Sequence, residues 1–241
     1  MSKHVKGFSS PKQYGAPSSE PWVVGTHPGP HSKETAIPIT LVLRDVIGYA
    51  DNLSEVKRVL HEEKVLVDGR VVRKYDAPVG IMDVVSFPDL EEHYRIVPNK
   101  LGKLVAVNID EEESKLKPME IMNKTMVSGN KLQYNLHDGT NFQVELEDPM
   151  SAEETGYSTR DTLIMKMPEM EINEHLKFKE GALAFITRGN NSGRIGKIKK
   201  IKIIKSSDPN LVTIEGENGT FDTLEDYVIV IGDDEPKITV K

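Results

Sequence analysis

The sequence predicts an α+β protein that consists mainly of β-strands. Two short helical patterns near residue 40 precede a β-hairpin, strand runs separated by turns fill the middle of the chain, and a last group of strands surrounds a glycine-rich loop. We therefore expect four consecutive parts: an N-terminal arm (1–38), a helix–hairpin module (39–87), a central antiparallel β domain (88–176) and a C-terminal small β-barrel with a short acidic tail (177–241).

Composition limits the class of protein. The chain has 241 residues, enough for one large domain or two to three small modules that each bury a core. No apolar run approaches the roughly 20 residues that cross a bilayer, and the first residues contain no apolar segment of secretory type. The absence of cysteine excludes disulfides and thiolate chemistry and fits a reducing, cytoplasmic setting.

The distribution of charge matters more than its sum. The formal net charge of −7 argues against nucleic acid for the chain as a whole. Basic residues nevertheless dominate from 177 to 205, whereas acids dominate from 88 to 174 and from 208 to 235. A local basic patch can bind phosphates on an acidic protein, although a solvated face explains such a run equally well.

The N-terminal arm is rich in proline and has no sustained hydrophobic periodicity. Scattered cations and aromatic or imidazole rings make it a candidate RNA-threading segment, and a disordered leader is the alternative. The candidate RNA-binding residues of the arm are Lys3, Lys6, Trp22, His31 and Lys33.

Two helical patterns follow the arm. Thr40 is a candidate N-cap for the first, and Asn52 with Glu55 resembles a capping box for the second. In the second helix Leu53, Val56, Val59 and Leu60 recur at helical spacing and should face a core.

The chain then predicts a hairpin over 64–73, with Asp68-Gly69 as a two-residue type I′ turn, and a further strand over 81–85. The basic residues of the module could converge on one surface that contacts phosphates, or could be ordinary surface charges. They are Arg44, Lys57, Arg58, Lys64, Arg70, Arg73 and Lys74.

The rest of the chain predicts strands and turns. Strands are expected at 104–107, 131–136, 141–146 and 162–165, with a turn at 137–139 and a helical turn or exposed loop at 110–117. Later strands are expected at 182–187, 194–198, 211–214 and 227–231, and a loose tail begins at Asp233. The candidate RNA-binding residues here are Arg188, Arg194, Lys197, Lys199 and Lys200.

Enzyme and metal templates fail. The loop over 188–198 matches neither a P-loop nor a dinucleotide fingerprint. His27 and His31 are four residues apart, but Pro28 and Pro30 prevent a helix that would align them on a metal. We therefore expect no catalytic residue, no metal and no cofactor.

Two segments resemble known RNA-associated modules. Residues 40–87, above all the Val67-Asp68-Gly69 hairpin, resemble the αL-type RNA-binding module named for ribosomal protein S4, although Glu63 stands where that module usually has glycine. Residues 178–205 resemble the KOW motif of small SH3-like barrels, which bind RNA or protein.

The order of arm, module, β domain and KOW segment resembles the S4e family of small-subunit ribosomal proteins. Stretches at 81–84, 135–139, 160–162 and 189–196 agree with its pattern. The acidic end, in place of the longer basic extension of eukaryotic members, favours the archaeal type and puts an RNA contact at the C-terminus in doubt.

This resemblance implies a structural constituent of the small (30S) ribosomal subunit that binds ribosomal RNA through phosphates. Its expected partners are that RNA and neighbouring ribosomal proteins, with no membrane, and it is expected to be monomeric off the ribosome. The alternatives are a transcription or translation factor whose KOW barrel binds RNA and protein, and an RNA-modifying enzyme that uses the first module for delivery.

Overall fold

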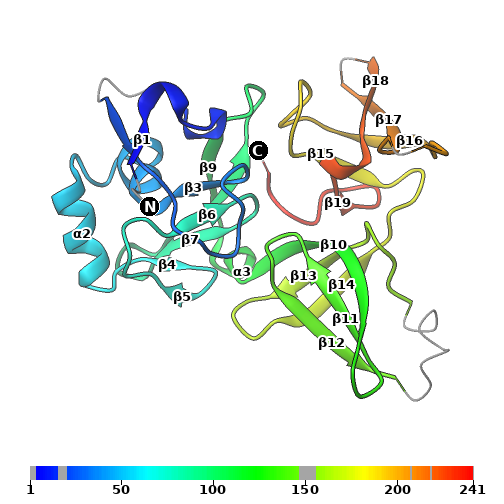
Figure 1. Ribbon diagram of the computed structural model, residues 1–241, viewed down its shortest axis with the longest axis horizontal. Helices are drawn as coiled ribbons and strands as arrows, with labels where there is room; N and C mark the ends of the chain where they lie inside the picture. The colour runs from blue at the N-terminus through cyan, green and yellow to red at the C-terminus, as the bar shows by residue number, and fades with distance from the viewer. Residues whose placement is uncertain (1–3, 16–20, 147–155, 207, 218, 241) are drawn as a thin grey trace.

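Antiparallel sheets form the body of the computed structural model (Figure 1). The structure describes residues 4–15, 21–146, 156–206, 208–217 and 219–240. Within them lie three five-stranded sheets and two smaller sheets, β1–β2 and β3–β6. The expectation of a mainly β chain is therefore confirmed. In the described ranges no helix has the length and apolar character needed to cross a membrane.

The N-terminal segment is folded where it is described, in contrast to the expected extended arm. β1 (His4–Lys6) pairs with β2 (Trp22–Val24), and the short 3-10 helices η1 (Gly7–Ser9) and η2 (Lys12–Tyr14) lie between them in sequence. β3 (Ala36–Pro38) pairs with β6 (Pro78–Gly80), and all three residues of β3 are buried. Long-range pairing, which proline-rich composition does not reveal, attaches this segment to the body.

The helical patterns form α1 (Ile39–Leu41), the π-helix η3 (Val42–Val46) and α2 (Leu53–His61). Thr40 is not the N-cap, because it lies inside α1 and its hydroxyl donates to the Tyr75 carbonyl at 2.6 Å. Asn52 is the N-cap of α2, as predicted, since its side chain accepts from the Glu55 amide at 3.0 Å. The apolar stripe of α2 faces the core, with Val56 and Leu60 fully buried.

The first large sheet has the order β5-β4-β7-β8-β9. Its hairpin joins β4 (Leu66–Val67) to β5 (Arg70–Val71) through Asp68 and Gly69, whose φ angles of 49° and 74° agree with the predicted type I′ turn. The strand expected over 81–85 is wrong in part, because Met82 has φ 69° and turns the chain into β7 (Val84–Phe87).

After η4 (Pro88–Leu90), the same sheet continues through β8 (Glu92–Pro98) and β9 (Leu104–Ile109). Strand pairing therefore crosses residue 87, where the sequence suggested the end of the module. The short helix α3 (Glu111–Ser114) follows.

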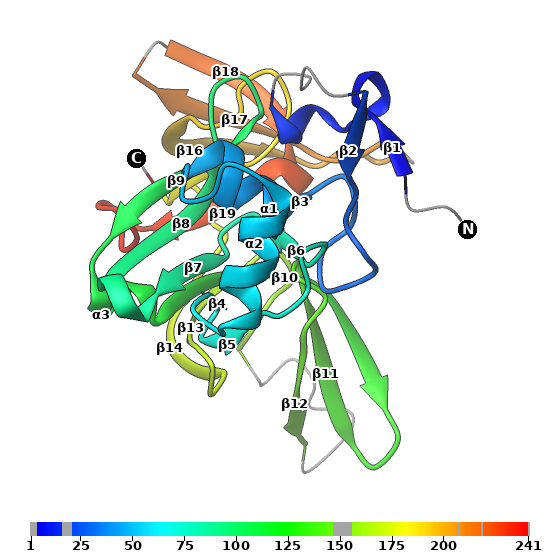
Figure 2. The same ribbon diagram turned by 90° about the vertical axis from the view of Figure 1, so that its left-hand side faces the viewer.

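The central sheet has the order β12-β11-β10-β13-β14. Its middle strand is β10 (Leu116–Val127), which sequence patterns missed. β11 (Lys131–Leu136), β12 (Asn141–Glu145) and β13 (Thr162–Lys166) occur close to their predicted positions, and β14 (Glu171–Leu176) completes the sheet. The β11–β12 hairpin extends away from the body (Figure 2).

The C-terminal sheet has the order β18-β17-β16-β15-β19. It consists of β15 (Leu183–Ile186), β16 (Ile195–Lys202), β17 (Leu211–Gly216), β18 (Gly219–Leu224) and, after η6 (Glu225–Tyr227), β19 (Val228–Gly232). Sequence patterns missed β18. One apolar core joins this sheet to the first one, with Ile96 and Phe185 among its members, while a second core around Met119 and Tyr134 lies in the central sheet.

The C-terminal tail is docked, not loose as expected. Ile238 and Val240 are 2% and 5% exposed. Arg95, which is fully buried, donates to the Thr239 carbonyl at 3.1 Å. Glu113 accepts from the Thr239 hydroxyl at 2.8 Å and forms an ion pair with Arg95. The tail therefore closes over a buried charge at the start of the central sheet.

A docked tail predicts that Ile238→Ala destabilises the fold. Removing a buried isoleucine side chain should lower the free energy of unfolding by about 2–4 kcal/mol, measured by urea denaturation. Lys237→Ala is the matched control, because Lys237 is exposed and its ion pair with Glu174 lies at the surface. Equal stability of the two variants would contradict the docked tail.

Candidate nucleic-acid interface

The helix–hairpin module presents α2 and the β4–β5 hairpin on one face (Figure 2). Lys57, Arg58 and Arg70 are exposed there. The apolar stripe of α2 is turned to the core, so its charged residues necessarily point to solvent. The structure thus places the module's cations on the surface, as a phosphate-binding face requires.

Most of these cations have carboxylate partners. Glu62 pairs with both Arg58 and Lys64 at 3.0 Å, and Glu63 pairs with Arg73 at 2.6 Å. Arg44 forms a bidentate pair with its neighbour Asp45, with N–O distances of 2.6 and 2.8 Å.

The other cations of the module differ. Lys57 lies over the Tyr75 ring, 4.7 Å from its centroid. Arg70 and Lys74 are exposed, and within the described residues neither forms an ion pair. Together with Lys57, they are therefore the cations of the module that phosphates can reach without displacing a carboxylate.

Glu63 occupies a strained backbone position. The end of α2 has the hydrogen bonds of a Schellman motif, in which the Lys64 amide donates to the Val59 carbonyl and the Glu63 amide to the Leu60 carbonyl. This motif puts Glu63 in the left-handed region with φ 58°. Glycine adopts that conformation without cost, which explains why the departure at Glu63 is locally unfavourable.

A buried charge cluster lies beneath the hairpin. The Lys117 ammonium contacts the carboxylates of Asp83 at 2.6 Å, Asp68 at 2.7 Å and Asp138 at 3.2 Å. The Lys117 side chain is 2% exposed. His31 lies 2.9 Å from Asp83 on the other side. The cluster joins the N-terminal segment, the first sheet, β10 and the β11–β12 turn.

For Asp68, Asp83 and Lys117, burial and the neighbouring opposite charges shift the pKa in opposite directions. Burial raises the pKa of Asp68 to about 6, despite the opposing charge of Lys117. Burial also disfavours the charged form of Asp83, but His31 and Lys117 outweigh it and hold the Asp83 pKa well below its ordinary value. For Lys117 the three carboxylates outweigh burial and raise its pKa. Burial, with the charge of Lys117, lowers the pKa of His137 to about 4.

The cluster is not a metal site. No group of three or more histidine, cysteine, aspartate or glutamate side chains among the described residues is arranged to hold an ion. The Lys117 ammonium occupies the space between the three carboxylates. Sequence reasoning missed the cluster because Asp68 and Asp138 had local turn roles and Lys117 had no distinguishing neighbours.

The arm residues divide into three outcomes. His31, expected at the RNA surface, is 7% exposed and bonded to Asp83, so the structure corrects that expectation. Lys6 and Trp22 are exposed, and the Lys6 ammonium lies 5.6 Å from the Trp22 ring centroid. Lys33 is also exposed. Lys3 lies outside the described residues.

The basic strip on β16 is largely neutralised. Lys197 pairs with Asp234 at 2.6 Å, and Lys199 lies 3.7 Å from Glu215. Lys200 is exposed, with no ion pair within the described ranges.

Two arginines next to this strip have aromatic partners instead. The guanidinium of Arg188 lies 6.0 Å from the Tyr227 ring centroid, and that of Arg194 lies 5.5 Å from the Phe221 ring centroid. Aromatic rings orient these cations and leave their charge uncancelled.

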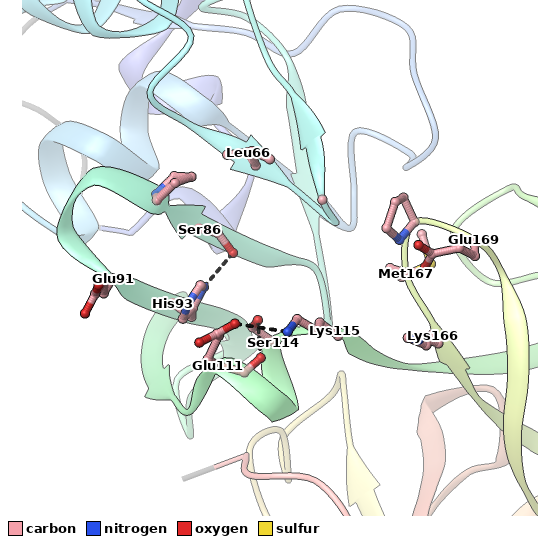
Figure 3. Close-up of a pocket in the computed structure, with 13 residues that line it drawn as sticks. Leu66, Ser86, Glu91, His93, Glu111, Ser114, Lys115, Lys166, Met167 and Glu169 are labelled. Carbon is pink, nitrogen blue, oxygen red and sulfur yellow. Dashed lines mark hydrogen bonds and ion pairs between the residues drawn. The ribbon is translucent and has the colours of Figure 1, made fainter.

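An open cleft of about 830 Å³ separates the first sheet from the β13–β14 turn (Figure 3). Its charges are mixed, because Lys115 and Lys166 face Glu91, Glu111 and Glu169. Lys115 pairs with Glu111 at 3.0 Å. The cleft therefore presents no positive excess that would favour a phosphate backbone.

The Lys117 cluster predicts a large effect of Lys117→Met. Removing the ammonium leaves three carboxylates close together with only His31, beside Asp83, to oppose their charge, and should cost about 3–5 kcal/mol of unfolding free energy at pH 7.5. The folded-state pKa values of the carboxylates then rise above their unfolded values, so the stability lost at pH 7.5 should return progressively as pH falls toward 5. Urea denaturation across this range measures it.

Lys115→Met is the control for this prediction, because Lys115 is exposed and paired only at the surface. It should change the free energy of unfolding by less than about 1 kcal/mol at either pH. A Lys117→Met protein as stable as this control would contradict the role of the cluster.

Relief of strain at position 63 predicts that Glu63→Gly stabilises the fold by about 0.5–1 kcal/mol, because glycine accepts the left-handed conformation. The exposed pair with Arg73, which this substitution removes, contributes less. Glu62→Gly, at φ −75°, should instead destabilise, and thermal unfolding compares the two. A loss of stability in Glu63→Gly would refute the strain.

Sequence comparisons identify relatives of this chain among known proteins. A sequence profile of the ribosomal family S4e matches residues 90–172. The chain is 44% identical over 230 residues to small ribosomal subunit protein eS4 of Archaeoglobus fulgidus, covering 95% of this chain and 93% of the relative. It is 42% identical over 240 residues to the protein of that name from Methanothermobacter thermautotrophicus, covering 99% and 96%.

A solved structure has the same fold. The crystal structure of the 30S ribosomal protein S4e from Thermoplasma acidophilum superimposes with a TM-score of 0.69 at 29% identity, covering 86% of this chain and 99% of the other. The 44% and 42% identities to the two eS4 relatives extend over nearly the full length of each chain. The chain therefore belongs to the ribosomal family S4e.

Proposed function

We propose that the chain is a structural constituent of the small ribosomal subunit that binds ribosomal RNA mainly through phosphate contacts. The observation that carries this proposal is the 44% identity, over nearly the full length of both chains, to a protein named small ribosomal subunit protein eS4. The relatives' name places them in the subunit, and we extend that placement to this chain. It acts without catalysis, metal or cofactor, as a cytoplasmic protein that is monomeric off the ribosome.

The helix–hairpin surface supports RNA binding through charge. Lys57, Arg70 and Lys74 are exposed on one module, and none has a carboxylate partner among the ion pairs of the described residues. Such cations neutralise phosphates and fix the register of a protein on RNA without reading bases. We assign this surface to the αL-type module of 39–87, supported by its type I′ hairpin and its capped helix.

The C-terminal sheet supports a second contact. We assign 177–241 to a KOW, SH3-like barrel, in which Arg188 and Arg194 lie near the two ends of the loop between β15 and β16. Neighbouring ribosomal proteins are its further partners. A factor that binds a protein through this barrel is the competing function, and a subunit protein differs from it by remaining on small subunits through a high-salt wash followed by sedimentation.

The phosphate mechanism predicts a change in salt dependence. Arg70→Gln combined with Lys74→Gln should lower the slope of log Kd against log salt by about 0.7–0.9 for each phosphate that the variant no longer neutralises. Filter binding to small-subunit ribosomal RNA at several salt concentrations measures this slope.

The matched control is Lys115→Gln with Lys131→Gln, two lysines in the central part of the chain that pair with Glu111 and Glu145, the first exposed and the second partly exposed. It should leave the slope unchanged. Wild-type binding that does not respond to salt would refute the proposed electrostatic mechanism.

A further inference from the structure

A second cleft, which is basic, lies where three segments distant in sequence meet. It has a volume of about 560 Å³, and its walls come from η2, the β8–β9 turn and the β15–β16 loop. These segments gather at the top of the view in Figure 1. Lys12, Lys100 and Arg188 line it against one acid, Glu34. A smaller hollow beside it shares Lys100 and adds Arg194 and Glu217.

We infer that this cleft and the smaller hollow beside it hold the phosphate backbone of ribosomal RNA, with Lys12, Lys100 and Arg188 in the cleft and Arg194 in the hollow as the neutralising residues. The inference rests on the proposed function and adds a location to it. The cleft gathers positive charge on a chain whose net charge is −7, so its sign is a local property of the fold.

The cations of the cleft differ from those of the β16 strip in their ion pairing. Within the described ranges none of the four forms an ion pair, whereas Lys197, Lys199 and Lys202 of the strip all have carboxylate partners. A phosphate that binds a paired lysine must displace a carboxylate. A phosphate in the cleft displaces no carboxylate from these cations.

The β8–β9 turn is held rigid by Asn99. Its side-chain oxygen accepts from the Leu101 amide at 2.9 Å and the Lys103 amide at 3.0 Å, and its own backbone amide donates to the Lys103 carbonyl at 2.8 Å. Lys100 is therefore presented from a fixed tip. Leu101 beside it is 75% exposed.

The β15–β16 loop is packed directly on that tip. A Cβ atom on Gly193 would lie 2.7 Å from the Asn99 carbonyl carbon and 2.8 Å from the Pro98 oxygen, so only glycine allows this approach. The Thr187 amide donates to the Tyr227 carbonyl at 2.8 Å, which fixes the start of the loop. The Tyr227 ring then lies beneath the Arg188 guanidinium.

The third wall of the cleft, η2, is also held in place. The Gln13 side-chain amide donates to the Lys33 carbonyl at 2.7 Å, and Tyr14 is buried, so Lys12 on the same turn keeps a fixed position. Three walls with anchored backbones hold these cations near one another, so the backbone of the site is already ordered before RNA binds.

Lys100→Gln with Arg188→Gln tests the cleft. The salt-dependence slope for small-subunit ribosomal RNA should fall by about 0.7–0.9 per neutralised phosphate, and affinity near 0.1 M salt should drop by about tenfold or more. Lys179→Gln with Lys202→Gln is the control in the same part of the chain, because both lysines are exposed and paired with Asp233 and Asp222. It should leave both quantities unchanged, and urea denaturation checks that each variant is folded.

The outcomes separate the inference from the proposed function. A lower slope in the Arg70 and Lys74 variant but not in the cleft variant would overturn the cleft and leave the proposed function standing. Salt-independent binding by the wild-type chain would overturn both.

A photo-crosslinker at position 101 gives an independent test in assembled subunits. Crosslinks to RNA are expected. Crosslinks to a ribosomal protein alone would assign the cleft to a protein partner and overturn the inference.

Discussion

The architecture depends on one buried ammonium group. Lys117 enters from the middle strand of the central sheet and contacts three carboxylates, Asp68, Asp83 and Asp138, each from a different turn. His31 completes the set from the N-terminal segment. Burying these charges singly would cost several kcal/mol each, so they are tolerated only when all are brought together. The cluster therefore makes the correct mutual placement of four chain segments a condition for folding.

Ion pairs also connect other parts of the fold. Arg95 and Glu113 fix the C-terminal tail against the start of the central sheet. Arg160 contacts Glu120 at 2.9 Å and also Asp226, which ties the central sheet to the C-terminal one. Burial raises the pKa of Glu120 to about 7 even with Arg160 beside it. Ion pairs and hydrogen bonds are directional, so they add to apolar packing in fixing how the sheets are oriented.

Ion pairing within the protein leaves only some of the exposed cations able to attract phosphates. Many exposed lysines and arginines lie beside carboxylates, which fits the acidic composition of the chain. Arg70 and Lys74 on the helix–hairpin module, and Lys100 and Arg188 around the second cleft, belong to the smaller group without ion pairs in the described residues. Two walls of the cleft are in direct contact, because the loop before β16 packs on the β8–β9 turn.

The sequence alone determined the features that depend on near neighbours. The type I′ hairpin at Asp68-Gly69, the Asn52 cap and most strands followed from local conformational preference, and module order indicated the family. Only the tertiary structure decided the rest: β10 was missed because residues 117–121 are all buried and break the alternation of a half-exposed strand. It also buried His31 and assembled the Lys117 cluster and the second cleft. These are contacts between residues far apart in the chain, and neither periodicity nor spacing carries information about which distant charges will meet.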